Sequence, residues 1–194
     1  RQKTYELDGR IHHYFQTPNK IVTVNNEAGN ATVAIVQQDN VTYGRLSDRC
    51  ATAVLINDTL YAGLKNGQIV AFSLQTLVQS SPLTTLPDQP HRLAISRDGS
   101  LLACNSKTNL RVINLRTAET EHSFSLPSPC EQLWFPSKKS VAFITDQYYV
   151  NEFLLDGSGS RRIRFRPSLD DHQLVDFVNS GDASFLLFAK GTVV

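Results

Sequence analysis

Short apolar runs alternate with polar turns along the chain at a nearly constant spacing. The turns are built from Asn, Asp, Gly, Ser, Pro and Lys, and most of these residue types favour reversals of the backbone. Anchor residues of five such turns follow one another at steps of 39, 40, 40 and 44 residues; they are Asn19, Asp58, Asp98, Lys138 and Asp182. This spacing indicates an internal repeat of about 40 residues.

The apolar runs that flank the turns have the length and composition of β-strands. They are about four to six residues long and rich in Val, Ile, Phe, Tyr and Thr, as at residues 141–144 and 185–188. No apolar stripe at helical spacing extends over ten or more residues. The pattern therefore predicts an all-β chain with four antiparallel strands in each repeat.

A four-stranded antiparallel sheet of about 40 residues is the blade of a β-propeller. One blade cannot bury its two apolar faces alone, so neighbouring blades must cover them. We expect a single β-propeller domain or propeller fragment over residues 1–194. Its four blades and partial fifth are expected at about 10–46, 50–86, 91–126, 130–166 and 172–194.

The third repeat carries the most specific motif. Its turn is Ser96-Arg97-Asp98-Gly99, which follows an apolar strand and precedes a Leu-Ala strand that begins at Leu101. Residues 91–120 therefore resemble a WD40 repeat, although Ile113-Asn114 replaces the family's Trp-Asp and the upstream Gly-His is missing. The resemblance implies a WD40-like β-propeller with degenerate repeats. YVTN-type and other propeller repeats of similar period also fit the spacing.

The number of blades raises the question of closure. The resemblance implies seven blades, whereas this chain holds fewer than five, and an open propeller exposes sheet faces and edges. Three arrangements would remove that exposure: the chain continues beyond Val194, another chain completes the ring, or residues 3–7 supply the outer strand of blade five. We expect continuation, because of the usual blade number.

Charge and cysteine content limit the kinds of partner and the cellular compartment that we expect. Nineteen Lys and Arg against 18 Asp and Glu give a net charge of +1, so binding to nucleic acid or an anionic membrane would need a local patch. We recognise neither a membrane helix nor a signal peptide. Cys50, Cys104 and Cys130 form no CxxC motif. They predict free buried thiols in an intracellular compartment, nuclear or cytoplasmic.

The sequence lacks the motifs of the common catalytic and nucleotide-binding sites, including GxSxG, the P-loop, GxGxxG and HExxH. His12 and His13 adjoin on a predicted strand, where neighbouring side chains face opposite sides and do not converge on a metal. Trp134 continues an apolar strand and is expected in the core. We therefore expect no enzyme activity, cofactor, metal or small-molecule substrate. A propeller enzyme of the lactonase or hydrolase type is the less favoured alternative.

The strongest local feature is the basic run at residues 161–166 in the outermost strand of blade four. Strand alternation places Arg162, Arg164 and Arg166 on one face. Such charges either protect a sheet edge from pairing or bind an acidic protein surface or an RNA backbone. The candidate partner-binding residues are Arg161, Arg162, Arg164, Arg166, Lys138 and Lys139.

These observations lead to one functional hypothesis and one main alternative. The leading hypothesis is a non-catalytic, WD40-like scaffold subunit that binds other protein subunits of an intracellular complex and does not bind a membrane. The alternative is an RNA-associated propeller subunit, in ribosome assembly or RNA modification, that uses the same basic edge.

Overall fold

The computed structural model describes residues 10–38, 40–146, 149–164, 172–180 and 183–190. Within these ranges the secondary structure consists of β-strands joined by turns, with no helix. No helix in the described ranges could therefore span a membrane. The predicted all-β fold is confirmed.

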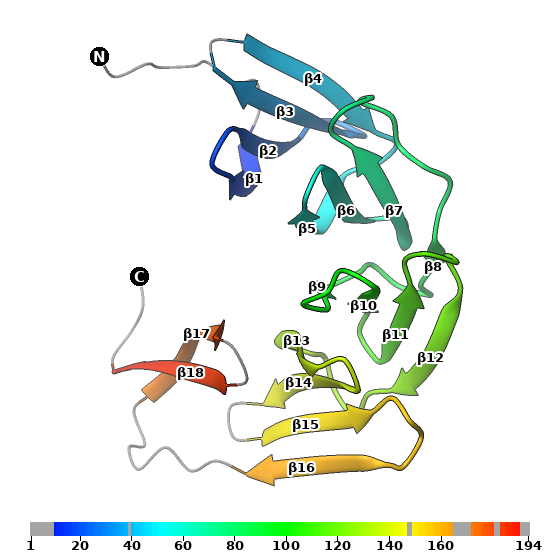
Figure 1. Ribbon diagram of the computed structural model, residues 1–194, viewed down its shortest axis with the longest axis vertical. Helices are drawn as coiled ribbons and strands as arrows, with labels where there is room; N and C mark the ends of the chain where they lie inside the picture. Colours follow the sequence, from blue (N-terminus) through cyan, green and yellow to red (C-terminus); the bar gives the residue numbers. More distant parts are fainter. Residues whose placement is uncertain (1–9, 39, 147–148, 165–171, 181–182, 191–194) are drawn as a thin grey trace. The chain divides into compact units, whose positions relative to one another are not determined.

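Four sheets of four antiparallel strands follow one another along the chain (Figure 1). Blade one contains β1 (Arg10–Gln16), β2 (Ile21–Asn26), β3 (Ala31–Gln37) and β4 (Asn40–Leu46). Blade two contains β5 (Cys50–Ile56), β6 (Thr59–Leu64), β7 (Gln68–Ser73) and β8 (Thr84–Thr85). Blade three contains β9 (Arg92–Ile95), β10 (Leu101–Asn105), β11 (Asn109–Asn114) and β12 (Thr120–Ser125). Blade four contains β13 (Gln132–Ser137), β14 (Ser140–Asp146), β15 (Tyr149–Leu154) and β16 (Ser160–Arg164).

A fifth sheet begins after these four. Its two described strands are β17 (His172–Ser180) and β18 (Ala183–Lys190), which pair with each other. The third strand expected at 192–194 lies outside the described residues. The prediction of four blades and a partial fifth is confirmed. The chain divides into two compact units, residues 1–90 with blades one and two and residues 91–194 with the rest, and each is described by itself.

In every complete blade the strands pair in sequence order, so the first-to-second and third-to-fourth turns lie at one end. We call this the odd-turn end of a blade and the opposite end its even-turn end. Backbone hydrogen bonds join the two odd turns in three blades: Leu74 N donates to Asp58 O, Leu115 N to Ser100 O, and Leu155 N to Lys139 O, at 2.8–2.9 Å. The repeat predicted from the turn spacing thus extends to individual hydrogen bonds.

The core of the first unit is formed by blades one and two packing face to face. Buried Val22, Val24 and Val33 of blade one form one cluster with Leu60 and Phe72 of blade two. At the even-turn end, the Asn26 amide bridges the blades: it donates to Cys50 O and accepts from Cys50 N, both at 2.8 Å. Apolar packing and a polar bridge therefore join these two sheets.

Blades three and four of the second unit form a core between them in the same way. Val112 and Leu126 form one buried cluster with Phe143 of blade four. The rings of Phe124 and Phe153 stack across the two blades with centroids 4.2 Å apart. Trp134 lies in a separate cluster of blade four and is only 5% exposed, so its predicted core position is confirmed.

Strand β1 departs from the simple alternation expected at the two adjacent histidines. Its register on β2 shifts between Ile11 and His13, which marks a bulge at this point. His12 is exposed, whereas His13 is partly buried and stacks against Phe15 with ring centroids 6.4 Å apart. A bulge adds one unpaired residue to a strand. Neither the repeat spacing nor the residue composition of the sequence predicted it.

Gly44 in β4 should tolerate no side chain. A Cβ atom there would lie 2.3 Å from Cζ of Phe72, which is fully buried. Overfilling a packed core typically costs about 1–3 kcal/mol. Gly44→Ala should lower the free energy of unfolding by that amount in urea denaturation, whereas Thr42→Ala on the same strand should change it far less. Equal stability of the two variants would contradict the tight packing of blade one on blade two.

Candidate functional site

The WD40-like turn of blade three holds its aspartate by a dense set of local hydrogen bonds. Asp98 Oδ1 accepts from the hydroxyls of Ser96 and Ser100, each at 2.8 Å, and from the Ser100 amide at 3.2 Å. Ser96 Oγ also accepts from Leu101 N at 2.9 Å. Gly99 has φ of 72°, a left-handed conformation that glycine adopts without strain. The motif therefore fixes one carboxylate at the odd-turn end of blade three.

Lys138 of blade four pairs with this carboxylate. Its Nζ lies 2.8 Å from Asp98 Oδ2, which the turn of blade three presents across the blade interface. The Lys138 ammonium, with the hydroxyls of Ser96 and Ser100, holds the pKa of Asp98 well below its ordinary value. Since the Lys138 side chain is 73% exposed, the pair lies in high dielectric, where an ion pair orients side chains more than it stabilises a fold.

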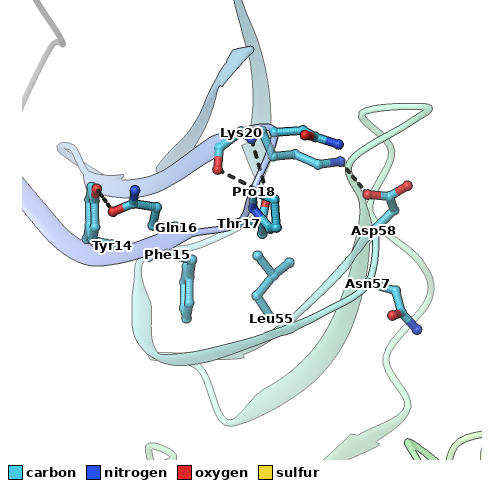
Figure 2. A pocket seen from close by; sticks show the side chains of 10 residues that line it. Tyr14, Phe15, Gln16, Thr17, Pro18, Lys20, Leu55, Asn57 and Asp58 are labelled. Atoms are coloured by element: carbon cyan, nitrogen blue, oxygen red, sulfur yellow. Dashed lines mark hydrogen bonds and ion pairs between the residues drawn. The ribbon is translucent and has the colours of Figure 1, made fainter. Parts of the chain in front are cut away.

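Blades one and two carry a counterpart with the charges exchanged. Lys20 of blade one pairs with Asp58 of blade two, whose other carboxylate oxygen accepts from Gln75 at 2.9 Å. These two contacts lower the pKa of Asp58. Figure 2 shows Lys20 and Asp58 meeting above Phe15 and Leu55, at the rim of a cavity of about 610 Å³. Among the described residues, a Lys–Asp pair therefore links the odd-turn ends of blades one and two, and another links those of blades three and four.

A second cavity, of about 310 Å³, lies beside the pair in blades three and four. It is lined by Leu101, Glu121, His122, Lys138, Lys139, Leu155 and Asp156. Asp156 accepts from Ser158 N at 2.8 Å, and hydrogen bonds from Ser158 lower its pKa, with a smaller contribution from Lys139. The recess thus combines an apolar wall with charges of both signs.

The structure separates the predicted basic residues into two groups. Lys138 and Lys139 lie in the β13–β14 turn at the odd-turn end, where β16 also begins, so Arg161 is the closest of the arginines to that end. From there β16 runs toward the even-turn end, where Arg164 pairs with Tyr149. At about 3.3 Å per residue, β16 carries its later arginines progressively farther from the lysine turn.

The individual arginines have different surroundings. Arg161 is exposed and lies opposite Glu152 in the sheet. Arg162 is exposed as well, and its guanidinium lies 3.7 Å from the ring centroid of Tyr149, a cation–π contact. Arg166 lies outside the described residues. Arg161 therefore has a carboxylate as its neighbour on the adjacent strand, and Arg162 has an aromatic ring.

The cysteines are positioned as structural residues. Cys50, Cys104 and Cys130 are free and buried, as predicted. Burial raises the pKa of each thiol to about 12, which disfavours the nucleophilic thiolate at neutral pH. In the described part of the chain, no group of three or more His, Cys, Asp or Glu side chains is arranged to hold a metal ion.

Sequence reasoning missed the two Lys–Asp pairs. It identified Asp58, Asp98 and Lys138 as turn anchors but assigned Lys138 only to a basic patch. A usable signal was present, because Lys20 precedes Asp58 by 38 residues and Asp98 precedes Lys138 by 40, close to one repeat. Opposite charges at matching turns of consecutive repeats indicate a contact between blades.

The Asp98–Lys138 pair should make stability depend on pH. The pKa of Asp98 is lowered in the folded chain, so its stabilising effect is present above the ordinary carboxylate pKa of about 4 and lost as pH falls through the lowered value. Thermal melting of Asp98→Asn should show a deficit at pH 7 that shrinks below pH 4. A deficit independent of pH would show that the charge of Asp98 does not matter.

Comparison with known proteins supports the fold. No protein-family model and no curated protein sequence matches the chain. Among solved structures, Kluyveromyces lactis Hsv2 is 14% identical, with a TM-score of 0.71, over 95% of this chain and 66% of that chain. The β-propeller domain of Myceliophteria thermophila Cps50 (Swd1) is 13% identical, with a TM-score of 0.59, over 69% of this chain and 46% of that one. The WD40 domain of Toxoplasma gondii coronin is 11% identical, with a TM-score of 0.60, over 75% of this chain and 43% of that one.

These matches show the fold of the chain and how much of each matched protein it covers. All three structures are WD40-type β-propeller proteins, so the predicted WD40-like resemblance is confirmed as a fold. The chain spans between 43% and 66% of their lengths. It therefore corresponds to part of each propeller protein it resembles.

Proposed function

We propose that the chain is a WD40-like protein-interaction module that binds a partner at the odd-turn end of blades three and four. The observation that carries the proposal is the recess beside Asp98 and Lys138, which combines an apolar wall of Leu101 and Leu155 with exposed charged side chains. Interfaces between proteins commonly combine an apolar centre with a polar rim.

The charges around the recess favour an acidic protein surface as the partner. Lys139 lines the recess and is exposed, and Arg161 is exposed near the start of β16, at the same end of blade four, while Glu121 and Asp156 fix where acidic groups of a partner are excluded. Such a mixture of signs selects one orientation of a partner. RNA presents only negative backbone charge, so the carboxylates in this recess weigh against the RNA-associated alternative.

We further propose a scaffold role within a larger intracellular complex rather than catalysis. The motivation is the chemistry of the described residues: buried cysteines with a raised pKa, and titratable side chains that do not converge as a metal or acid–base site. A propeller enzyme of the lactonase or hydrolase type would need such a cluster, and its test is direct elemental analysis of the purified chain for calcium or zinc.

Charge reversal at the recess should weaken partner capture without unfolding the chain. Lys139→Glu combined with Arg161→Glu leaves the Asp98–Lys138 pair intact while reversing two exposed positive groups near the odd-turn end of blade four. The matched control, Lys65→Glu with Lys107→Glu, makes the same charge change at exposed even-turn positions. Proteins retained from an extract of the source organism are compared by mass spectrometry, with thermal melting as the check on folding.

We expect the recess variant to lose specific partners by tenfold or more, about 1.4 kcal/mol, while the even-turn control retains them. Equal retention by both variants would show that the recess is not the binding site. Loss of the same partners from both would indicate an effect of net charge alone.

A further inference from the structure

The outer strand of each blade offers a sheet edge, and three of the four described edges are protected. In blade two, β8 is only two residues long and follows Pro82. In blade three, β12 carries Glu121 and its pairing with β11 is interrupted by a register shift. In blade four, β16 carries Arg161, Arg162 and Arg164 among five residues. Short strands, bulges and charges are the usual protection against pairing with another chain.

Strand β4 of blade one is neither short nor bulged, and it carries only one charge. It is seven residues long and pairs with β3 at every position from Asn40 to Leu46, without a register shift. Its sequence is mostly β-branched, aromatic or polar, and Arg45 is its single charged residue. It is the last strand of its sheet, as Figure 1 shows for the blue blade, and no other described strand pairs with its outer edge.

Its glycine does not weaken this conclusion. Glycine in a strand often marks a bulge, but Gly44 keeps regular pairing with Val33. The close approach of the Phe72 ring explains it, since any larger residue would displace that ring. Gly44 therefore makes room for Phe72 in the core while β4 keeps its regular pairing.

One face of β4 also offers side chains that a partner strand would contact. By alternation Val41, Tyr43 and Arg45 lie on the same face. Tyr43 is 50% exposed and Arg45 is exposed, and both line a recess of about 440 Å³ with Thr32 and Glu27. The Glu27 carboxylate accepts a hydrogen bond from the Thr32 hydroxyl, which is its partner in the recess.

We propose that β4 accepts an extended peptide from a partner protein as a fifth strand of blade one, antiparallel to β4. Alternate residues of an edge strand direct their N–H and C=O groups outward, and an extended backbone satisfies them. The peptide places an acidic residue opposite Arg45 and an aromatic or β-branched residue opposite Tyr43. This surface lies in the first unit and is independent of the recess in blades three and four.

Charge complementarity selects a foreign peptide over a second copy of the chain. Antiparallel pairing of two β4 strands centred on Tyr43 would place Arg45 of each copy opposite Val41 of the other. Neither arginine would then face an acid. An acidic residue in a partner peptide supplies the cross-strand charge pair that self-association lacks, and such pairs stabilise strand pairing.

The test uses the full chain and a defined probe by isothermal titration calorimetry. The probe is an acetylated, amidated heptapeptide with threonine at odd positions and glutamate, tyrosine and valine at the second, fourth and sixth. We expect a Kd below about 1 mM, weakened at least tenfold by Arg45→Glu. A probe with lysine in place of glutamate should recover binding to that variant. Arg116→Glu reverses an exposed arginine in blade three and should leave binding unchanged.

Backbone methylation distinguishes strand addition from side-chain docking. N-methyl groups on the alternate amides that face β4 should abolish binding, whereas N-methyl groups on the other amides should preserve it. Equal effects of the two patterns, or no binding by the unmodified probe, would overturn the proposal. Sedimentation equilibrium showing a dimer that Arg45→Glu disrupts would overturn it in favour of self-pairing. Unchanged probe binding by Lys139→Glu with Arg161→Glu separates this proposal from the proposed function.

Discussion

The architecture depends on the face-to-face burial of apolar sheet surfaces between neighbouring blades. A four-stranded sheet has two apolar faces and no internal means of covering them, so each blade is stable only against its neighbour. Phe72 is fully buried between blades one and two, and the stacked rings of Phe124 and Phe153 join blades three and four. The glycine at position 44 follows from the same constraint, because the strand above Phe72 has no space for a side chain.

The polar features of the odd-turn ends follow from this packing. Once two blades stack in register, their first turns lie close enough for a lysine of one to reach an aspartate of the other, as in Lys20–Asp58 and Asp98–Lys138. The order of charges is reversed between the two pairs, which shows that the turn position matters more than which blade supplies the acid. Binding residues commonly lie on loops that a rigid scaffold positions, which is why the proposed binding site lies beside one of these pairs.

Local turn chemistry made most of the fold predictable. Asn57 with φ of 50° and Gly99 with φ of 72° occupy left-handed conformations that their residue types tolerate, so the hairpins were readable from sequence. The bulge in β1 and the two-residue β8 were not readable, because each depends on how a neighbouring strand pairs. The site was predictable only in part: alternation gave the face of Arg162, but Tyr149 beneath it and Asp98 beside Lys138 are contacts made through the fold.

The packing of one blade on the next is tested most directly by a double-mutant cycle between Phe124 and Phe153, whose stacked rings cross the interface of blades three and four. The free energy of unfolding is measured for Phe124→Leu, Phe153→Leu and the double variant by urea denaturation. Face-to-face packing predicts a coupling free energy of about 0.5–1.5 kcal/mol. Losses that add to within about 0.3 kcal/mol would mean that the rings do not meet and would contradict the stacked-blade arrangement.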